Sequence, residues 1–198
     1  MKKTLSIVGK LRLMAAMSML ILIAVSGYML LNQYQDNRRD REIAVRQTVE
    51  VGYSILAWAH QLETSGSHTR EQAQQMAQQA LQTVRYSGNE YFWLQDMNAR
   101  VVMHPFRTDL NGKDGSGIKD PDGQAIFVMF AQRAQKSDGG GLVEYQWPKP
   151  GQDKPAPKIS YVKGFAPWGW VLGSGVYADD LRAQFLSSLW RAAAVEVM

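Results

Sequence analysis

Cysteine is absent from this chain of 198 residues, and histidine occurs only three times. Without cysteine the chain has no disulfide framework, no thiolate zinc site and no cysteine nucleophile. The histidines are dispersed, and neither an H-E-x-x-H spacing nor a G-x-S-x-G nucleophile elbow occurs, so metalloenzyme and serine hydrolase chemistry are not expected. The sequence therefore predicts neither an enzyme nor a resident metal or cofactor.

Outside its first 12 residues the chain also has no net charge. Lys2, Lys3, Lys10 and Arg12 are the only charged residues before Asp36, and the rest of the chain carries 18 basic residues against 18 acidic ones. Surfaces that bind nucleic acid need clustered lysine and arginine. Nucleic-acid binding is therefore not expected, and the positive charge at the amino terminus needs another explanation.

A long uncharged run follows these four basic residues. Residues 13–31, LMAAMSMLILIAVSGYMLL, contain no charge, and at about 1.5 Å per residue a helix of this length spans nearly the ~30 Å of a bilayer core. The basic residues predict that residues 1–12 stay in the cytoplasm and that the chain after residue 31 lies outside. A cleaved signal peptide is the alternative, but its apolar region is normally shorter and followed by small residues, whereas YMLLNQ stands at residues 28–33. We expect an uncleaved membrane anchor.

Two amphipathic helices are predicted after the anchor. Residues 32–64 lack proline, and their apolar residues alternate at spacings of four and three, which gives one narrow stripe along a long helix: Val45, Val49, Gly52, Leu56 and Ala59. The stripe faces either a second copy of the chain, which would make a homodimer, or this chain's own sheet or second helix. That second helix is predicted over residues 69–86, where Thr69 and Gln72 form a capping-box pattern.

The composition then changes to short strand-like segments separated by turn signals. Strands are predicted over residues 90–95, 100–104, 142–147, 158–164 and 169–177, the first two as a hairpin. A loop over residues 106–123 precedes a helix over residues 124–136, for which Asp122 is the expected cap. The predicted fold class is α+β: a long N-terminal helix and an antiparallel sheet with flanking helices, preceded by one transmembrane helix.

Aromatic and basic side chains gather on the predicted strands. Tyr145 and Trp147 point to one side of their strand, and Tyr91 and Trp93 share one face of the first strand. The Pro- and Gly-rich segment 148–157 is too polar to bury and is predicted to be a hairpin connection. Aromatic residues at period two can simply be sheet core, but buried tyrosine and lysine need partners for their polar ends. Phenol groups around one ammonium group would form a small anion-binding cavity walled by rings.

Several sequence blocks resemble one family of sensor domains. The blocks are His104-Pro105, Tyr145-x-Trp147-Pro148, Lys158-x-x-Tyr161 and Gly169-Trp170-Val171-x-Gly173-x-Gly175-x-Tyr177. Together they resemble the single-Cache sensor domain, second subtype, of bacterial methyl-accepting chemotaxis proteins, and the resemblance covers residues 32–182. It implies a PAS-like fold with a pocket, commonly for small carboxylates, between the sheet and its covering loops. On this basis we expect Lys158 and Arg85 to pair with a carboxylate, Tyr145, Tyr161 and His104 to donate hydrogen bonds to it, and Tyr91 and Trp93 to form walls.

The sequence and the resemblance together imply a domain organisation and a set of partners. Residues 32–182 are expected to form a periplasmic sensor held at the inner membrane, and residues 183–198 a helix that leads into a second, truncated transmembrane span. The expected partners are a short carboxylate, the membrane, a second copy of the chain, and a cytoplasmic kinase and adaptor reached through a missing signalling region. The sensor of a histidine kinase or cyclase is one alternative. A membrane-tethered scaffold or adhesion domain without a ligand is the alternative from another class.

Overall fold

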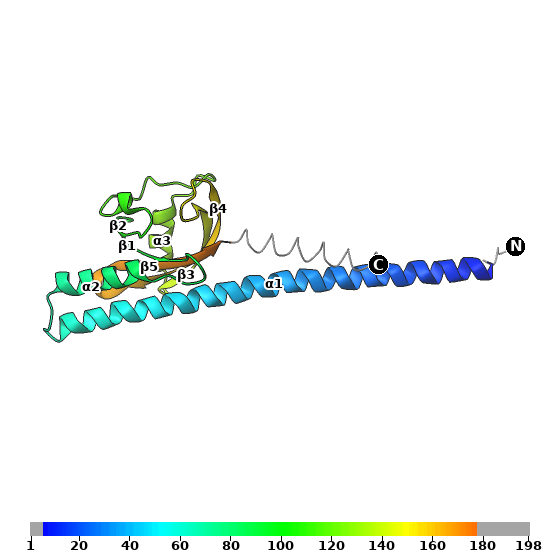
Figure 1. Cartoon of the computed structure of the whole chain (residues 1–198), viewed down its shortest axis with the longest axis horizontal. Coiled ribbons are helices and arrows are strands. Elements are labelled where there is room, and N and C mark those ends of the chain that lie inside the picture. Colours follow the sequence, from blue (N-terminus) through cyan, green and yellow to red (C-terminus); the bar gives the residue numbers. More distant parts are fainter. Residues whose placement is uncertain (1–5, 178–198) are drawn as a thin grey trace. The chain divides into compact units, whose positions relative to one another are not determined.

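The computed structural model describes residues 6–177 and confirms the predicted α+β fold (Figure 1). The helices are α1 (Ile7–Thr64), α2 (Arg70–Thr83) and α3 (Ile126–Ala134), with short 3₁₀ turns at η1 (Thr108–Leu110) and η2 (Ala166–Trp168). The strands are β1 (Phe92–Asp96), β2 (Val101–Met103), β3 (Gly140–Pro148), β4 (Pro155–Phe165) and β5 (Trp170–Tyr177). The described residues fall into two compact units, divided between Arg39 and Asp40.

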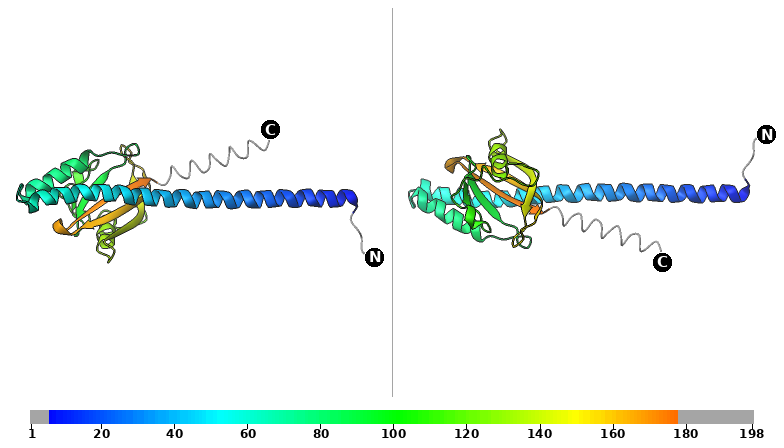
Figure 2. Two further views of the ribbon diagram at one scale, coloured as in Figure 1. Left: turned by 90° about the horizontal axis from the view of Figure 1, so that it is seen from below. Right: turned by 90° about the horizontal axis from the view of Figure 1, so that it is seen from above.

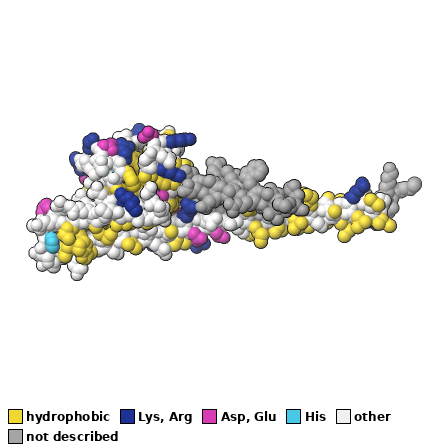
Figure 3. Space-filling model, in the orientation of Figure 1, with side chains coloured by type: hydrophobic (Ala, Val, Ile, Leu, Met, Phe, Trp, Pro, Cys, Tyr) yellow, Lys and Arg dark blue, Asp and Glu magenta, His cyan; other side chains and the backbone are white. Residues whose placement is uncertain are grey.

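The first unit is the amino-terminal part of α1, and large apolar side chains are exposed along it, from Ile7 to Leu31 (Figure 3). Among residues 6–177, α1 is the one helix long and apolar enough to cross a membrane by length and composition. Its most apolar window has a mean hydropathy of 2.1, and none of that window is buried. The expectation that residues 13–31 cross a bilayer remains a prediction.

The second unit is built on one five-stranded antiparallel sheet. The strand order is β2-β1-β5-β4-β3. All neighbouring strands are antiparallel, and the predicted hairpin is present as β1 and β2, with an irregular register between Leu94 and Gln95. Strand β4 lies between β3 and β5, so that Lys158 is opposite Tyr145 on one side and Tyr177 on the other. This register brings one lysine and two tyrosines to the same end of the sheet.

Helices cover both faces of this sheet. The part of α1 after Arg39 and helix α2 lie on one face, and α3 lies on the other (Figure 1). Figure 2 shows the part of α1 after Arg39 passing across the sheet. The apolar stripe of α1 is fully buried against this sheet; a Cβ at Gly52 would lie only 2.7 Å from Cε1 of Phe92. The stripe therefore packs on the chain's own sheet, and it does not supply the surface for a homodimer.

Two local predictions about connections are corrected. Helix α2 does begin with the capping box of Thr69 and Gln72, but Asp122 does not cap α3, because α3 begins only at Ile126. The Oδ1 atom of Asp120 instead accepts hydrogen bonds from the backbone N–H groups of Asp122 and Gln124, at 3.0 and 2.9 Å. The connection predicted over residues 148–157 is shorter, because strand pairing continues to Pro148 and Pro155. The helix expected over residues 183–198 lies outside the described residues.

Candidate ligand-binding site

A small cavity lies between the sheet and α3, and we call it the inner cavity. Its walls are rings and apolar side chains from the sheet and from α3: Tyr91, Trp93, His104, Tyr145, Trp147, Ile126, Phe127 and Phe130. Its volume is about 10 Å³, which is room for about one water molecule. The side chains of this face therefore nearly fill the space between sheet and helix.

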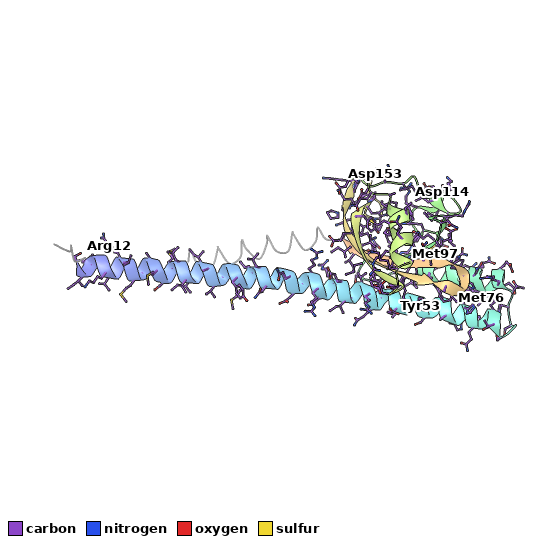
Figure 4. The ribbon with its side chains drawn as sticks, turned by 180° about the vertical axis from the view of Figure 1, so that it is seen from behind. Arg12, Tyr53, Met76, Met97, Asp114 and Asp153 are labelled. Carbon is purple, nitrogen blue, oxygen red and sulfur yellow. The ribbon has the colours of Figure 1, made fainter. Side chains whose placement is uncertain are left out.

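A larger space, which we call the outer pocket, adjoins the inner cavity. It has a volume of about 310 Å³ and is lined by Phe106, Arg107 and residues 148–153 of the connection after β3. Tyr91, His104 and Trp147 line both spaces, so these three rings separate them. Asp153 of this connection lies on the side of the domain away from Tyr53 of α1 (Figure 4).

A fully buried lysine lies beside the inner cavity. The side chain of Lys158 has no exposed surface, and its Nζ atom lies 3.7 Å from Oε2 of Glu90. The rings of Tyr91 and Tyr177 flank this ammonium group, with centroids 4.1 and 4.4 Å from Nζ. Within residues 6–177 the Nζ atom has no hydrogen-bond partner. Burial lowers the pKa of Lys158 from its usual value, and the Glu90 carboxylate partly opposes that shift. An anion that entered here would find a cation whose hydrogen-bonding capacity is unused.

His104 presents a neutral ring to both spaces. Its Nδ1 atom accepts hydrogen bonds from the backbone N–H groups of Arg107 and Phe106, at 2.9 and 3.3 Å. Burial, together with the charges of Lys158 and Arg107, lowers the pKa of His104 to about 3. The imidazole is therefore neutral at ordinary pH, and because Nδ1 is an acceptor its hydrogen resides on Nε2. The two backbone hydrogen bonds to Nδ1 hold the ring in place, so His104 offers its Nε2–H group as a hydrogen-bond donor.

Two further donors belong to the walls of the inner cavity. The Tyr145 hydroxyl lies 3.0 Å from Oγ of Ser160, and burial raises the pKa of Tyr145, so the phenol keeps its proton. The indole Nε1 of Trp93 is buried and, among the described residues, has no hydrogen-bond partner. The polar groups around the cavity are thus mainly hydrogen-bond donors, which is the arrangement that an anion requires.

The structure brings together five of the seven predicted site residues, which are Tyr91, Trp93, His104, Tyr145 and Lys158. Arg85 is not among them: its side chain is exposed, and its Nη1 atom donates to carbonyl groups at the end of α2. The Arg85 guanidinium lies over Phe106, which lines the outer pocket, with its central carbon 4.8 Å from the ring centroid.

Tyr161 also lies elsewhere, on the face of the sheet that packs against α1. It is half-buried there, with Cζ of Arg46 5.9 Å from its ring centroid. The physical reason is the alternation of side chains along a strand. Lys158 faces α3 with Tyr145, so Tyr161, three residues further along β4, faces the other way.

Sequence reasoning missed several residues of the site. Glu90 precedes β1 in a turn closed by the bridge between Tyr86 and Glu90, and nothing in its local sequence indicates an ion pair with a lysine 68 residues away. Trp147 could have been found, because it shares a strand face with Tyr145. The rings of α3 that line the cavity, Phe127 and Phe130, were not among the predicted site residues.

The sequence matches one protein family, described as single Cache domain 2, over residues 37–191. The chain belongs to this family. The solved structure of a Cache chemosensory domain, described for carboxylic acid recognition, shares 46% identity with this chain, covers 73% of it and 97% of its own length, and has a TM-score of 0.70. A periplasmic sensor domain of a chemotaxis protein shares 41% identity over 71% of this chain and 96% of its own, with a TM-score of 0.69.

Two curated relatives extend well beyond the Cache domain. The methyl-accepting chemotaxis protein McpP of Pseudomonas putida is 37% identical over 195 residues, which are 98% of this chain and 36% of that protein. The sensor histidine kinase MctS of Rhizobium johnstonii is 34% identical over 114 residues, which are 58% of this chain and 24% of that protein. The chain thus spans about a third or less of the curated relatives it matches. The family match and these relatives indicate a sensor domain.

Proposed function

We propose that this chain is the sensor region of a transmembrane chemoreceptor, and that its Cache domain binds a small carboxylic acid. The observation that carries the proposal is the buried Lys158 ammonium beside a cavity whose polar groups are donors. A lysine at this depth is costly unless its charge is compensated and its N–H groups are hydrogen-bonded; Glu90 lies 3.7 Å away, and within residues 6–177 Nζ has no hydrogen-bond partner. The relative described for carboxylic acid recognition shares 46% identity with this chain, which supports the same ligand class.

In this proposal the carboxylate lies near Lys158 and accepts hydrogen bonds from Nε2 of His104 and from a phenol. The hydrocarbon part of the acid lies against the rings of α3, Phe127 and Phe130. The inner cavity has only about 10 Å³, so binding must displace side chains. The rings of Tyr91, His104 and Trp147 are the ones to move, because they separate this cavity from the outer pocket.

Signal transmission would begin at Tyr177, the last residue of β5. Its ring flanks Lys158, its hydroxyl donates to the carbonyl of Pro148 at 2.7 Å, and its carbonyl accepts from Nη1 of Arg41 on α1 at 3.4 Å. A ligand that repositions Lys158 therefore acts on β5 and on α1 together. It can shift the equilibrium between two arrangements only by its difference in affinity for them.

The placement at the membrane and the cytoplasmic partners are also part of the proposal. Residues 1–12 would lie in the cytoplasm, residues 13–31 in the inner membrane and the Cache domain in the periplasm, in accordance with the basic amino terminus. As in a chemoreceptor, the chain would act as a homodimer and would reach a kinase and an adaptor through a signalling region. The match to MctS favours a second candidate, the sensor of a histidine kinase.

A binding screen separates these receptors from a scaffold without ligand. The full 198-residue chain, purified in detergent micelles, would be heated with formate, acetate, propionate, succinate, glycine or methylammonium. A bound acid at about a hundred times its Kd contributes about 2.7 kcal/mol of stability, which raises the Tm by about 5–10 °C. We expect this shift with a short carboxylate and not with methylammonium. Equal Tm values across the panel would contradict the proposed function.

A further inference from the structure

The indole of Trp93 has a hydrogen-bond donor for which residues 6–177 supply no acceptor. The side chain is 2% exposed, it lines the inner cavity, and its Nε1 has no hydrogen-bond partner within the part of the chain that the structure describes. Buried indole N–H groups usually find a partner, and each exception needs a physical reason. Sequence reasoning treated Trp93 only as a wall.

Packing on both sides holds this indole in place. On the sheet side it rests on Gly173 of β5, where an added Cβ would lie only 2.7 Å from Cη2 of the ring. On the other side the Phe130 ring packs against it, with centroids 5.0 Å apart and planes inclined at 39°. The ring therefore cannot turn to another acceptor, and the glycine at this position in β5 makes its placement possible.

Trp168 provides the contrast within the same chain. It is 7% exposed, comparably buried, but its Nε1 donates to Oε2 of Glu63 at 2.6 Å on the opposite face of the sheet. This fold can thus pair a buried indole with a carboxylate. At Trp93, no residue among 6–177 provides such an acceptor.

We propose that Nε1–H of Trp93 donates a hydrogen bond to the carboxylate of the bound acid, so that Trp93 is a specificity-determining ligand contact. This inference rests on the proposed function. An indole N–H and an ammonium group can only donate, and so can Nε2–H of the neutral His104. A carboxylate offers only acceptors, whereas the isosteric primary amide would direct an NH₂ group at donors. The site therefore favours an acid over its amide.

The indole proton itself provides the test. The full chain, labelled with ¹⁵N-tryptophan in detergent micelles, would be titrated with acetate, and with formate and propionate if acetate does not bind. The signal of Trp93 is identified by its loss in Trp93→Phe. We expect it to move downfield and to exchange more slowly with solvent on binding, while the Trp168 signal stays in place. Losing one hydrogen bond to a charged acceptor weakens binding by about ten- to a hundredfold, so we expect that loss for Trp93→Phe and none for Trp168→Phe.

The outcomes are distinguishable. An acid that binds and leaves the Trp93 indole proton unshifted overturns the contact, while the proposed function stands. An acid and its amide that bind equally well overturn the specificity role. If no acid of the series binds, the proposed function fails and the inference fails with it. Should Trp93→Phe not fold, the titration of the unmodified chain still decides, because the other five indole signals are assigned by their own phenylalanine variants.

Discussion

Replacing Lys158 by methionine tests the charge at the centre of the proposed site. Methionine is unbranched and of similar length, so it fills the space between the rings of Tyr91 and Tyr177 without the ammonium group. A charge-assisted hydrogen bond contributes about 1.5–3 kcal/mol. Lys158→Met should therefore weaken acetate binding by about ten- to a hundredfold, measured by isothermal titration calorimetry on the full chain in micelles.

Lys163 of the same strand is the matched control. It lies on the face of β4 toward α1, where its Nζ is 2.5 Å from Oε2 of Glu50 and 4.2 Å from the ring centroid of Tyr53. Lys163→Met removes a lysine from the same strand but not from the site, so the Kd for acetate should not change. Near-UV circular dichroism checks that both variants retain native packing. An unchanged Kd in a folded Lys158→Met protein, or equal losses in both variants, would refute the reasoning.

The same lysine predicts the direction of the pH dependence. Burial lowers the pKa of Lys158 below the usual 10.5, so it loses its proton at a lower pH than an ordinary lysine does. The protonated form attracts a carboxylate and the neutral form does not. The affinity for acetate should therefore fall as the pH rises through the pKa of Lys158, and this fall should be absent from Lys158→Met.

Three further predictions concern neighbouring features. Tyr145→Phe should weaken acetate binding, whereas Tyr161→Phe, on the opposite face of the sheet, should leave the Kd unchanged in the same calorimetric assay. The pKa of His104 is about 3 in the folded chain and about 6.5 in the unfolded chain. Between these pH values the imidazole is protonated only in the unfolded chain, so the free energy of unfolding decreases as the pH falls from 6.5 toward 3. Urea unfolding should show this loss, by up to about 1.4 kcal/mol per pH unit, and His104→Gln should flatten it. Gly52→Ala should lower the unfolding free energy by about 1–3 kcal/mol, because the added Cβ would lie 2.7 Å from the Phe92 ring. Alanine favours helices more than glycine does, so a stabilised variant would contradict the packing described.

The elements of this fold were predictable because their signals are local. The box of Thr69 and Gln72 marks the start of α2, and the alternation of aromatic residues marks the strands. The partner of the α1 stripe was not predictable, since spacing gives a buried face but not its neighbour. The clustering of Val49, Leu56 and Ala59 with sheet residues and the close approach of Gly52 to Phe92 identify that neighbour as the chain's own sheet.

The site was predictable in part, and the two residues that lie elsewhere show why. Tyr161 lies on the other face of the sheet from Lys158, because side chains alternate along β4 and the two residues are three positions apart. The sequence already shows this spacing. Arg85 lies two residues after the end of α2, and its guanidinium donates to the carbonyl groups of Gln82 and Val84 at that helix end. The ion pair with Glu90, and the lack of a partner for the Trp93 indole among the described residues, depend on tertiary packing, so no local pattern could reveal them.

The near absence of free volume between sheet and α3 has a consequence for timing. With about 10 Å³ available, a carboxylate can enter the inner cavity only while the rings of Tyr91, His104 and Trp147 are displaced. The observed affinity is then the affinity of this open state multiplied by the fraction of molecules in it. Uptake would then level off at high ligand concentration, at the rate of the opening itself. The rate at which the sensor responds to a new ligand would then be set by the opening motion of these aromatic rings rather than by diffusion.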